Sequence, residues 1–508
     1  MSEGPVIRVG EWEIPHDELK LQAARLAGAL AAHGVEFGER VAIVLRNDPD
    51  FLLVSAACGV IGAVPVPVNW HWRGEELRHV LTHSSSKAVF AHSAFVDDVE
   101  AALPDGVPLV EVPVRDEQAA AYGAAALTGR YPVLDEWLAE HEPHAEPLDA
   151  APMSLIYTSG TTGLPKGVIR SPMTPEQSQQ VAMTTLNGMG LKPGMRTIVT
   201  APMYHSAPNA QSLFSVALGI DLTVMARFDP ERFLAIIEEQ RITHAQVVPT
   251  MFVRLLELPD EIKQRYDLSS LEAVVHAAAP CPGHVKKRMI EWFGPVILEY
   301  YGGTETGIVV TCDSAEWLAH EGTVGKPVAD ADIHVFDPLG ELLPQGETGE
   351  IYVKPPHFWP GFTYLGQEDK RREIDRDGYL SIGDVGRVDS DGFLYLSDRA
   401  RDMVISGGVN IYPIEIEGCV LELPGVRDVA VFGIPDDSYG EALAAHVDVH
   451  PDAALTEDEI RDHVRHRLAG YKVPRVIVFD DQLPREESGK IFKRRIRERY
   501  WQDAGRTI

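Results

Sequence analysis

Cysteine is scarce in this chain of 508 residues, and its scarcity excludes two kinds of structure. The 4 cysteines, Cys58, Cys281, Cys312 and Cys419, stand far apart and form no C-x-x-C pair. Neither a disulfide framework nor a zinc site is therefore predicted. A reduced, cytoplasmic setting fits this cysteine usage best.

Basic residues are in deficit. Lys and Arg total 46 against 76 for Asp and Glu, which gives a formal net charge of −30. Such acidity disfavours a general role in nucleic-acid binding, so no nucleic-acid partner is expected. A local basic patch could still hold a polyanionic ligand.

Long uncharged runs are rare as well. The N-terminal stretch MSEGPVIRVGEWEIP lacks the basic start and apolar run of a signal peptide. Residues 51–68 carry no charge and approach the length that spans a bilayer, but Gly59, Gly62, Pro65 and Pro67 would break a spanning helix. We expect a buried helix followed by a short strand, and no stable membrane insertion.

The order of local patterns predicts an α/β fold with more than one domain, as the chain length also requires. Helical patterns precede short apolar runs, as in LKLQAARLAGALAAHG before RVAIVL, and this alternation is typical of parallel α/β layers. Short runs divided by Gly, Pro and Asp indicate a small β-rich subdomain from about residue 325 to 400. We predict a large N-terminal domain, residues 1–400, and a small α+β C-terminal domain, residues 401–508.

The strongest local motif follows the apolar strand SLIY and reads TSGTTGLPKG. Glycines let the backbone turn tightly toward phosphate oxygens, hydroxyls add donors, and a lysine supplies positive charge. The motif is not the Walker loop, because its GK[ST] ending is absent. A plain surface turn is the alternative. The residues predicted to hold phosphate are Thr158, Ser159, Gly160, Thr161, Thr162, Gly163 and Lys166.

Together with three later motifs, this loop resembles the adenylate-forming superfamily of acyl-CoA synthetases, luciferases and peptide-synthetase adenylation domains. The later motifs are YGGTE at residues 301–305, YLSIGDVG at residues 379–386 and SGK at residues 488–490. They stand in the family's order and spacing over residues 10–500, and bacterial acyl-CoA synthetases are most similar. The resemblance implies two parallel α/β layers and a β-rich subdomain in the N-terminal domain, followed by a mobile C-terminal domain.

The same resemblance implies a nucleotide site. Thr304 would contact the α-phosphate, and Glu305 would hold Mg²⁺, a hard cation that prefers carboxylate and phosphate oxygens. Asp384 and Arg399 would bind the ribose hydroxyls, although a cap or a surface ion pair could also use such residues. The adenine would lie against the segments that contain Ala278, Ala279, Pro280, Tyr301 and Gly302, which could otherwise be ordinary packing.

The resemblance also implies catalytic and moving parts. Lys490 would bridge the substrate carboxylate and the α-phosphate, which lowers their repulsion where negative charge builds up. Arg401 would be the hinge, and Gly407 and Gly408 would line the path of the pantetheine thiol after the small domain rotates. His205 would border the carboxylate beside the acyl pocket, although a lone histidine is more often structural.

The implied function is a two-step ligation with ATP, Mg²⁺ and coenzyme A as cofactors. A hydrophobic carboxylic acid and ATP would give acyl-AMP and pyrophosphate, and the acyl group would then pass to coenzyme A. An amine or a carrier-protein pantetheine as acceptor is the alternative, and the sequence leaves open a homodimer and the identity of the acid. A non-catalytic nucleotide-binding scaffold is disfavoured because Lys166, Glu305, Asp384, Arg399 and Lys490 are all present.

Overall fold

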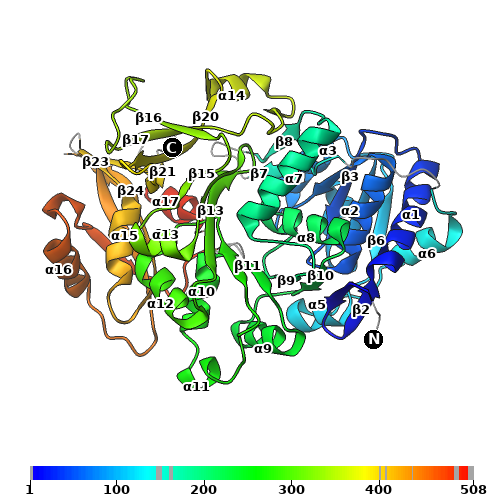
Figure 1. Ribbon diagram of the computed structural model, residues 1–508, viewed down its shortest axis with the longest axis horizontal. Coiled ribbons are helices and arrows are strands. Elements are labelled where there is room, and N and C mark those ends of the chain that lie inside the picture. Colours follow the sequence, from blue (N-terminus) through cyan, green and yellow to red (C-terminus); the bar gives the residue numbers. More distant parts are fainter. Residues whose placement is uncertain are drawn as a thin grey trace.

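The structure is a computed structural model that describes residues 4–144, 152–158, 164–399, 402–406, 409–436, 439–485 and 491–501. Figure 1 shows the N-terminal elements in blue and cyan at one end of the long axis, green elements in the centre, and the orange and red C-terminal elements at the other end. Among the described residues, no helix combines the length and apolar character that crossing a membrane requires.

The first layer is a parallel sheet of four strands in the order β4-β3-β5-β6. The predicted alternation of helix and strand is confirmed here, since a helix precedes each of the four strands in the sequence. The strands are β3 (Arg40–Val44), β4 (Val64–Pro67), β5 (Ala88–His92) and β6 (Leu109–Val112), and the nearby helices are α1 (His16–Ala32), α2 (Pro49–Ile61), α3 (Gly74–His83), η1 (Ser93–Phe95), α4 (Val96–Ala102), α5 (Asp116–Tyr122) and α6 (Leu134–Glu140).

The uncharged run at residues 51–68 is a buried helix followed by a strand, as predicted. Asp48 caps α2 by accepting a hydrogen bond from the backbone N–H of Asp50, and Pro49 occupies the first turn, where a missing N–H is harmless. Gly62 ends the helix in the left-handed region at φ 70°. The run is therefore apolar because it lies in the core of an α/β layer, packed against α1.

The second layer is a sheet of nine strands in the order β15-β14-β13-β12-β11-β9-β10-β1-β2. Its centre, from β13 to β1, is parallel as predicted, whereas β14, β15 and β2 pair antiparallel at the edges. The strands are β1 (Val6–Val9), β2 (Trp12–Pro15), β9 (Arg196–Val199), β10 (Asp221–Val224), β11 (His244–Val247), β12 (Ala273–His276), β13 (Ile297–Gly303), β14 (Gly307–Cys312) and β15 (Lys326–Pro327).

Helices cover both faces of this second sheet. On one face, α7 (Pro175–Met189) packs on β13 and β14, and α8 (Ser206–Leu218) packs on β9 and β10. On the other, α10 and α12 share a hydrophobic core with side chains of β11, β12 and β13. The remaining helices of this region are α9 (Pro230–Gln240), α10 (Pro249–Leu256), α11 (Asp260–Lys263), α12 (Gly283–Phe293) and α13 (Ser314–Ala319).

Two small sheets complete the large region. One contains three strands in the order β18-β8-β7, and the other contains β16-β17-β20-β19 with β21 paired to β20, which confirms the predicted β-rich segment. The elements are β7 (Ile156–Thr158), β8 (Lys166–Arg170), β16 (Asp332–Phe336), β17 (Gly349–Lys354), β18 (Phe362–Tyr364), α14 (Glu368–Glu373), β19 (Asp375–Arg376), β20 (Tyr379–Val388) and β21 (Leu394–Arg399).

The C-terminal residues form a sheet of their own with the order β23-β22-β25-β24 and β26 paired to β25. Its core is separate from those of the larger region, which suits the predicted α+β unit, while the boundary at residue 401 stays a prediction. The elements are β22 (Val404–Ser406), β23 (Val409–Ile411), α15 (Pro413–Leu421), β24 (Val426–Asp436), β25 (Gly440–Val449), α16 (Glu457–Arg467), η2 (Gly470–Lys472), β26 (Val476–Phe479) and α17 (Lys493–Trp501).

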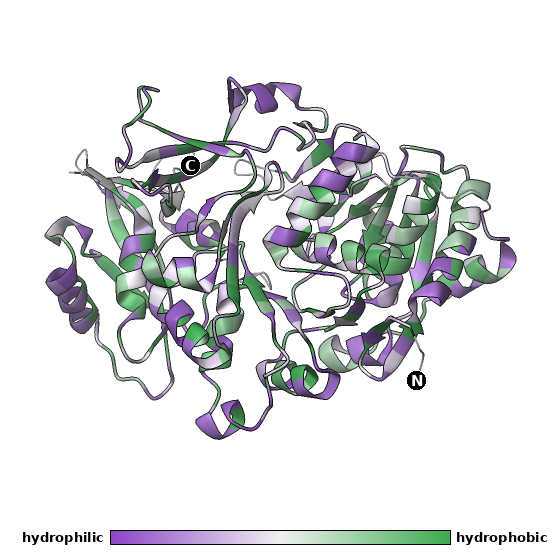
Figure 2. Ribbon diagram, in the orientation of Figure 1, coloured by the Kyte–Doolittle hydropathy of each residue, from purple (hydrophilic) through white to green (hydrophobic). Residues whose placement is uncertain are grey.

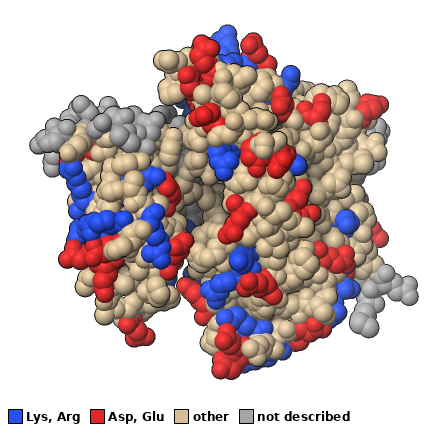
Figure 3. Space-filling model, turned by 60° about the vertical axis from the view of Figure 1, so that its left-hand side comes forward, with Lys and Arg blue, Asp and Glu red and all other residues tan. Residues whose placement is uncertain are grey.

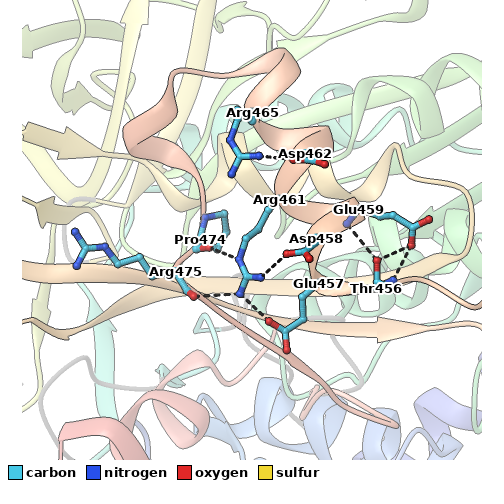
Figure 4. Close-up of polar contacts among 9 residues, drawn as sticks. All are labelled: Thr456, Glu457, Asp458, Glu459, Arg461, Asp462, Arg465, Pro474 and Arg475. Carbon is cyan, nitrogen blue, oxygen red and sulfur yellow. Dashed lines mark hydrogen bonds and ion pairs between the residues drawn. The ribbon is translucent and has the colours of Figure 1, made fainter.

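An arginine ties α16 to the segment that precedes β26 (Figure 4). Arg461 pairs with Glu457 at 2.7 Å and donates to the carbonyl oxygens of Pro474 and Arg475 at 3.4 and 3.2 Å. Thr456 and Glu459 form a capping box at the start of α16. Figure 2 shows that α14 and α16 are mostly hydrophilic, whereas the strands beneath the helices are hydrophobic.

Candidate active site

The end of β13 and the start of α8 meet at the predicted phosphate-contact residue. β13 ends at Gly303, and the next residue, Thr304, donates through Oγ1 to Ser206 Oγ at 3.3 Å. His205 directly precedes α8, so it lies beside this contact. A Cβ at Gly302 would come within 1.8 Å of the carbonyl oxygen of Gly307, so the last part of β13 requires glycine at this position.

Lys166 and Glu305, predicted to bind phosphate and Mg²⁺, approach the same tyrosine. Tyr364 in β18 donates through its hydroxyl to Glu305 Oε1 at 3.0 Å, and Lys166 Nζ lies 5.4 Å from the centre of the Tyr364 ring. Burial and the neighbouring Glu305 raise the pKa of the Tyr364 hydroxyl, which therefore stays a donor at neutral pH. Lys166 and Glu305 are 139 positions apart in sequence, and both thus lie beside one side chain of the small β18-β8-β7 sheet.

The two strands that flank the predicted phosphate loop, β7 and β8, are neighbours in the small β18-β8-β7 sheet. Thr158 ends β7, Lys166 begins β8, and the two are register partners in an antiparallel pair. Residues 159–163 lie outside the described residues, so the predicted roles of Ser159, Gly160, Thr161, Thr162 and Gly163 stay predictions. The described residues on either side, Thr158 and Lys166, lie opposite each other in the pair of strands.

A half-buried arginine holds the turn that carries Thr304 and Glu305. Arg170 Nη1 donates to the carbonyl oxygen of Glu305 at 2.7 Å, and Nη2 donates to that of Thr304. The guanidinium also lies over the rings of Trp359 and Phe362, at 5.1 and 5.7 Å. Burial lowers the pKa of Arg170 to about 10, and Glu305 partly opposes that shift, so the group stays charged at neutral pH.

The two predicted ribose contacts are neighbours in one sheet. Asp384 in β20 is the register partner of Arg399 in β21. Asp384 is 8% exposed, and its Oδ2 accepts a hydrogen bond from the Tyr301 hydroxyl at 2.8 Å. This bond joins the predicted ribose carboxylate to the predicted adenine-side tyrosine, so both belong to one structural unit.

The other predicted adenine segment follows β12, the strand next to β13. Ala278 adopts φ 72°, which is unusual for a residue with a side chain, and it is exposed together with Pro280, while Ala279 is half-buried. This surface position at the carboxyl end of a parallel strand is where ligands of open α/β sheets bind. The remaining predicted residues, Arg401, Gly407, Gly408 and Lys490, lie outside the described residues.

Matches to known proteins extend over this whole arrangement. The model of the AMP-binding enzyme family matches residues 6–363, and that of the AMP-binding enzyme C-terminal domain matches residues 415–490. The chain belongs to the AMP-binding enzyme family. The resemblance inferred from the motifs is confirmed, and so are the α/β fold class and the expectation of an enzyme of the acid–CoA ligase type.

Relatives of this AMP-binding enzyme match it from end to end. A feruloyl-CoA synthase from Amycolatopsis sp is 35% identical over 497 residues, which cover 97% of this chain and 95% of the relative. A medium/long-chain-fatty-acid–CoA ligase from Mycobacterium tuberculosis is 32% identical over 533 residues, with 99% of this chain and 89% of the relative covered.

Solved structures of similar proteins cover this AMP-binding enzyme equally well. The amide bond synthetase from Marinactinospora thermotolerans superposes with a TM-score of 0.83 at 25% identity, covering 98% of this chain and 97% of the other. The o-succinylbenzoate CoA synthetase from Bacillus subtilis, in complex with its acyl-adenylate intermediate, gives 0.82 at 27% identity, covering 98% and 96%. The sequence therefore has the fold of both a thioester-forming and an amide-forming enzyme.

The donor set around Glu305 fits a magnesium ion that is shared with a nucleotide. Among the described residues there is no cluster of three or more His, Cys, Asp or Glu side chains that could hold a metal by themselves. Mg²⁺ commonly uses one or two carboxylates, substrate phosphates and water, so a lone Glu305 beside the predicted phosphate contacts matches that mode. In this AMP-binding enzyme the nucleotide would have to supply most of the ligands.

Three contacts in the site escaped the sequence analysis: Ser206, Arg170 and Tyr364. Ser206 follows His205 directly, and a hydroxyl beside a predicted site residue was the only local signal for it. Arg170 and Tyr364 stand in short strands with no motif of their own, and only strand pairing brings them to Thr304 and Glu305.

Figure 3 shows acidic and basic side chains interspersed along a groove on one face of the enzyme.

Proposed function

We propose that this enzyme activates a hydrophobic carboxylic acid with ATP, forming acyl-AMP and pyrophosphate, and then transfers the acyl group to coenzyme A. The observation that carries the proposal is that Tyr364 contacts both Glu305 and Lys166, while Thr304, the neighbour of Glu305 in sequence, contacts Ser206. A threonine hydroxyl, a carboxylate and a lysine are the groups that bind an α-phosphate, Mg²⁺ and the outer phosphates. Relatives named as CoA ligases over nearly the whole chain support the same reaction.

The residues divide the work according to their chemistry. Thr304 and the loop at residues 158–166 orient ATP, Glu305 holds Mg²⁺, and Asp384 with Arg399 binds the ribose. Lys490 neutralises the approaching carboxylate and the α-phosphate, where a more anionic centre forms during attack. His205 borders the carboxylate, since it stands beside Ser206 and thus beside Thr304.

Coenzyme A is the proposed acceptor, and the proposal includes a rotation of the C-terminal domain about Arg401. After adenylate formation, Lys490 withdraws and Gly407 and Gly408 approach the path of the thiol. An amine acceptor is the second candidate, because a solved amide bond synthetase matches this chain as completely as the solved CoA synthetase does. We also propose a cytoplasmic location, since all four cysteines are free.

The test is acid-dependent ATP–pyrophosphate exchange over a library of aliphatic, aromatic and alicyclic acids, followed by product analysis. One accepted acid is then incubated with ATP and either coenzyme A or a panel of amines. Formation of thioester at rates well above amide supports the proposal, and the reverse ratio replaces coenzyme A by an amine. If no acid supports exchange, the proposed activation step is wrong.

A further inference from the structure

A polar pair lies on the face of the large sheet that α7 and α8 cover. Gln246 in β11 donates through Nε2 to the hydroxyl oxygen of Tyr300 in β13, at 3.0 Å. β12 runs between these two strands, so the side chains meet across it. Neither residue belongs to the nucleotide site described above, and no motif includes Gln246.

Strand register fixes the direction in which the pair points. Gln246, Val275 and Leu298 are aligned across β11, β12 and β13, and Tyr300 stands two residues after Leu298, on the same face. That face meets α7, because a Cβ at Gly190, just after α7, would lie 2.5 Å from Leu298 Cδ1. The intervening Glu299 points the other way, toward Lys286 of α12.

The side chains of β13 on this face are less buried than those on its opposite face. β13 is an interior strand, and its side chains on the opposite face, Glu299 and Tyr301, are only 6% and 8% exposed. Leu298 and Tyr300, in contrast, are partly exposed although α7 covers them. The cluster against which Tyr300 packs is apolar and includes Met189, Leu191, Met195, Ile220 and Ile308.

The pair offers one donor and one acceptor that the described residues leave unmatched. Gln246 is 5% exposed, and its Oε1 has no hydrogen-bond partner among them. The Tyr300 oxygen accepts from Gln246, so its own proton is available, and burial raises the pKa of this hydroxyl so that the proton is retained. If the Gln246 amide is flipped, its Oε1 accepts from the Tyr300 hydroxyl instead. The pair then still leaves one donor, Nε2, and one acceptor, the Tyr300 oxygen. A hydroxyl group complements both, since it donates and accepts at once.

The distance from the reacting end sets the length of a matching ligand. Tyr300 precedes Thr304 by four residues and Gly302 by two, and a strand rises about 3.3 Å per residue, which places the pair about 7 to 13 Å from the carboxylate position. The residues near this stretch are small: Ala277 follows β12, and Gly302 and Gly303 end β13. A flat or slender acid would fit this stretch better than a bulky branched one.

We propose that the acid activated by this enzyme has an elongated, largely apolar skeleton with a hydroxyl group at the end remote from its carboxylate, and that Tyr300 and Gln246 select this hydroxyl. The inference rests on the proposed function and adds the substrate class. Its physical basis is the cost of leaving a buried donor and acceptor unpaired when the ligand lacks the hydroxyl. Tyr300 and Gln246 are thus specificity residues rather than members of the nucleotide site.

The test compares matched acids that differ only in the remote hydroxyl: para-hydroxycinnamic with cinnamic acid, and terminally hydroxylated octanoic with octanoic acid. kcat/KM is measured by ATP–pyrophosphate exchange for the natural sequence, Tyr300→Phe and Gln246→Met. The natural sequence is expected to favour the hydroxylated member of at least one pair by about 10- to 100-fold. Tyr300→Phe keeps the ring and is expected to reduce that preference below about 3-fold, through a loss on the hydroxylated acid alone.

Tyr266→Phe is the matched control, because it also removes a tyrosine hydroxyl that is bonded to another side chain, Glu231, away from this sheet face. It should leave the preference unchanged. Equal rates within every acid pair for the natural sequence, or an unchanged preference in Tyr300→Phe, would overturn this inference while acid activation itself stands. Gln246→Met is the second test variant, since it removes the amide without shortening the side chain, and it should reduce the preference for the hydroxylated acid in the same way. Absence of exchange with all acids would instead overturn the proposed function.

Discussion

Arg170 gives the most direct check on the geometry of the site. Its guanidinium is fixed by carbonyl oxygens of Thr304, Glu305 and Pro360, so it braces two loops against β8. Arg170→Met keeps most of the apolar stem and its packing on Trp359, but removes all of these donors. We therefore expect the turn after β13 to lose its position while the sheets remain intact.

The size of the effect follows from the bonds lost. Hydrogen bonds from a charged donor contribute about 1.5–3 kcal/mol each, so the bonds to Thr304 and Glu305 hold their turn with at most about 3–6 kcal/mol. Both residues are half-buried, so water can replace part of this, and the loss of global stability should stay near 1–3 kcal/mol. A displacement of about 1 Å at reacting groups costs about 100-fold in rate. Arg170→Met should therefore slow acid-dependent exchange by about that factor.

The assay is ATP–pyrophosphate exchange at saturating acid, with thermal unfolding measured on the same samples. Arg170→Lys should be intermediate, near a 10-fold loss, because one ammonium cannot reproduce the fork of a guanidinium. Arg232→Met is the control, since it removes an exposed arginine paired with Glu239 on α9. An exchange rate of Arg170→Met within about 3-fold of the natural sequence would refute the reasoning, and so would equal loss in the control.

Three further predictions concern other parts of the chain. Lys490→Ala should abolish acyl-AMP formation while thioester formation from supplied acyl-AMP largely survives; equal loss of both rates would refute the division of labour between the two conformations. Lys286→Met should destabilise the fold by about 3–5 kcal/mol in urea unfolding, because it leaves the buried carboxylate of Glu299 without its partner at 2.6 Å, and replacing both residues by apolar ones should restore most of this. Burial lowers the pKa of His244 to about 4, so stability is complete above the unfolded pKa near 6.5 and falls by up to about 3 kcal/mol as the pH drops toward 4. His244→Gln should flatten that part of the urea-unfolding profile, and an unchanged slope would contradict the assignment.

Local sequence patterns predicted the helix α2 and the parallel layers, because each depends on residues close together in the sequence. The helix α2 was predicted from the uncharged run that Gly62, Pro65 and Pro67 interrupt, and the structure adds that Asp48 caps it and Gly62 ends it. The alternation of helices and strands predicted parallel layers because parallel strands need a crossover connection. The antiparallel edges β14, β15 and β2 were not predicted, since edge strands face fewer constraints on direction and carry no distinct sequence pattern.

The motifs TSGTTGLPKG and YGGTE, with the family resemblance, named candidate nucleotide-site residues one by one, and their roles stay predictions. Only tertiary structure decided how these motifs meet: strand pairing brings Tyr364 to Glu305 and Arg170 to Thr304, from segments with no motif. The polar pair of Gln246 and Tyr300 likewise exists only because β12 separates their strands by one position. The amino-acid sequence by itself determined which chemistry the chain carries, through residue type and short spacing. The distances over which that chemistry acts depend on long-range strand order, which no local pattern encodes.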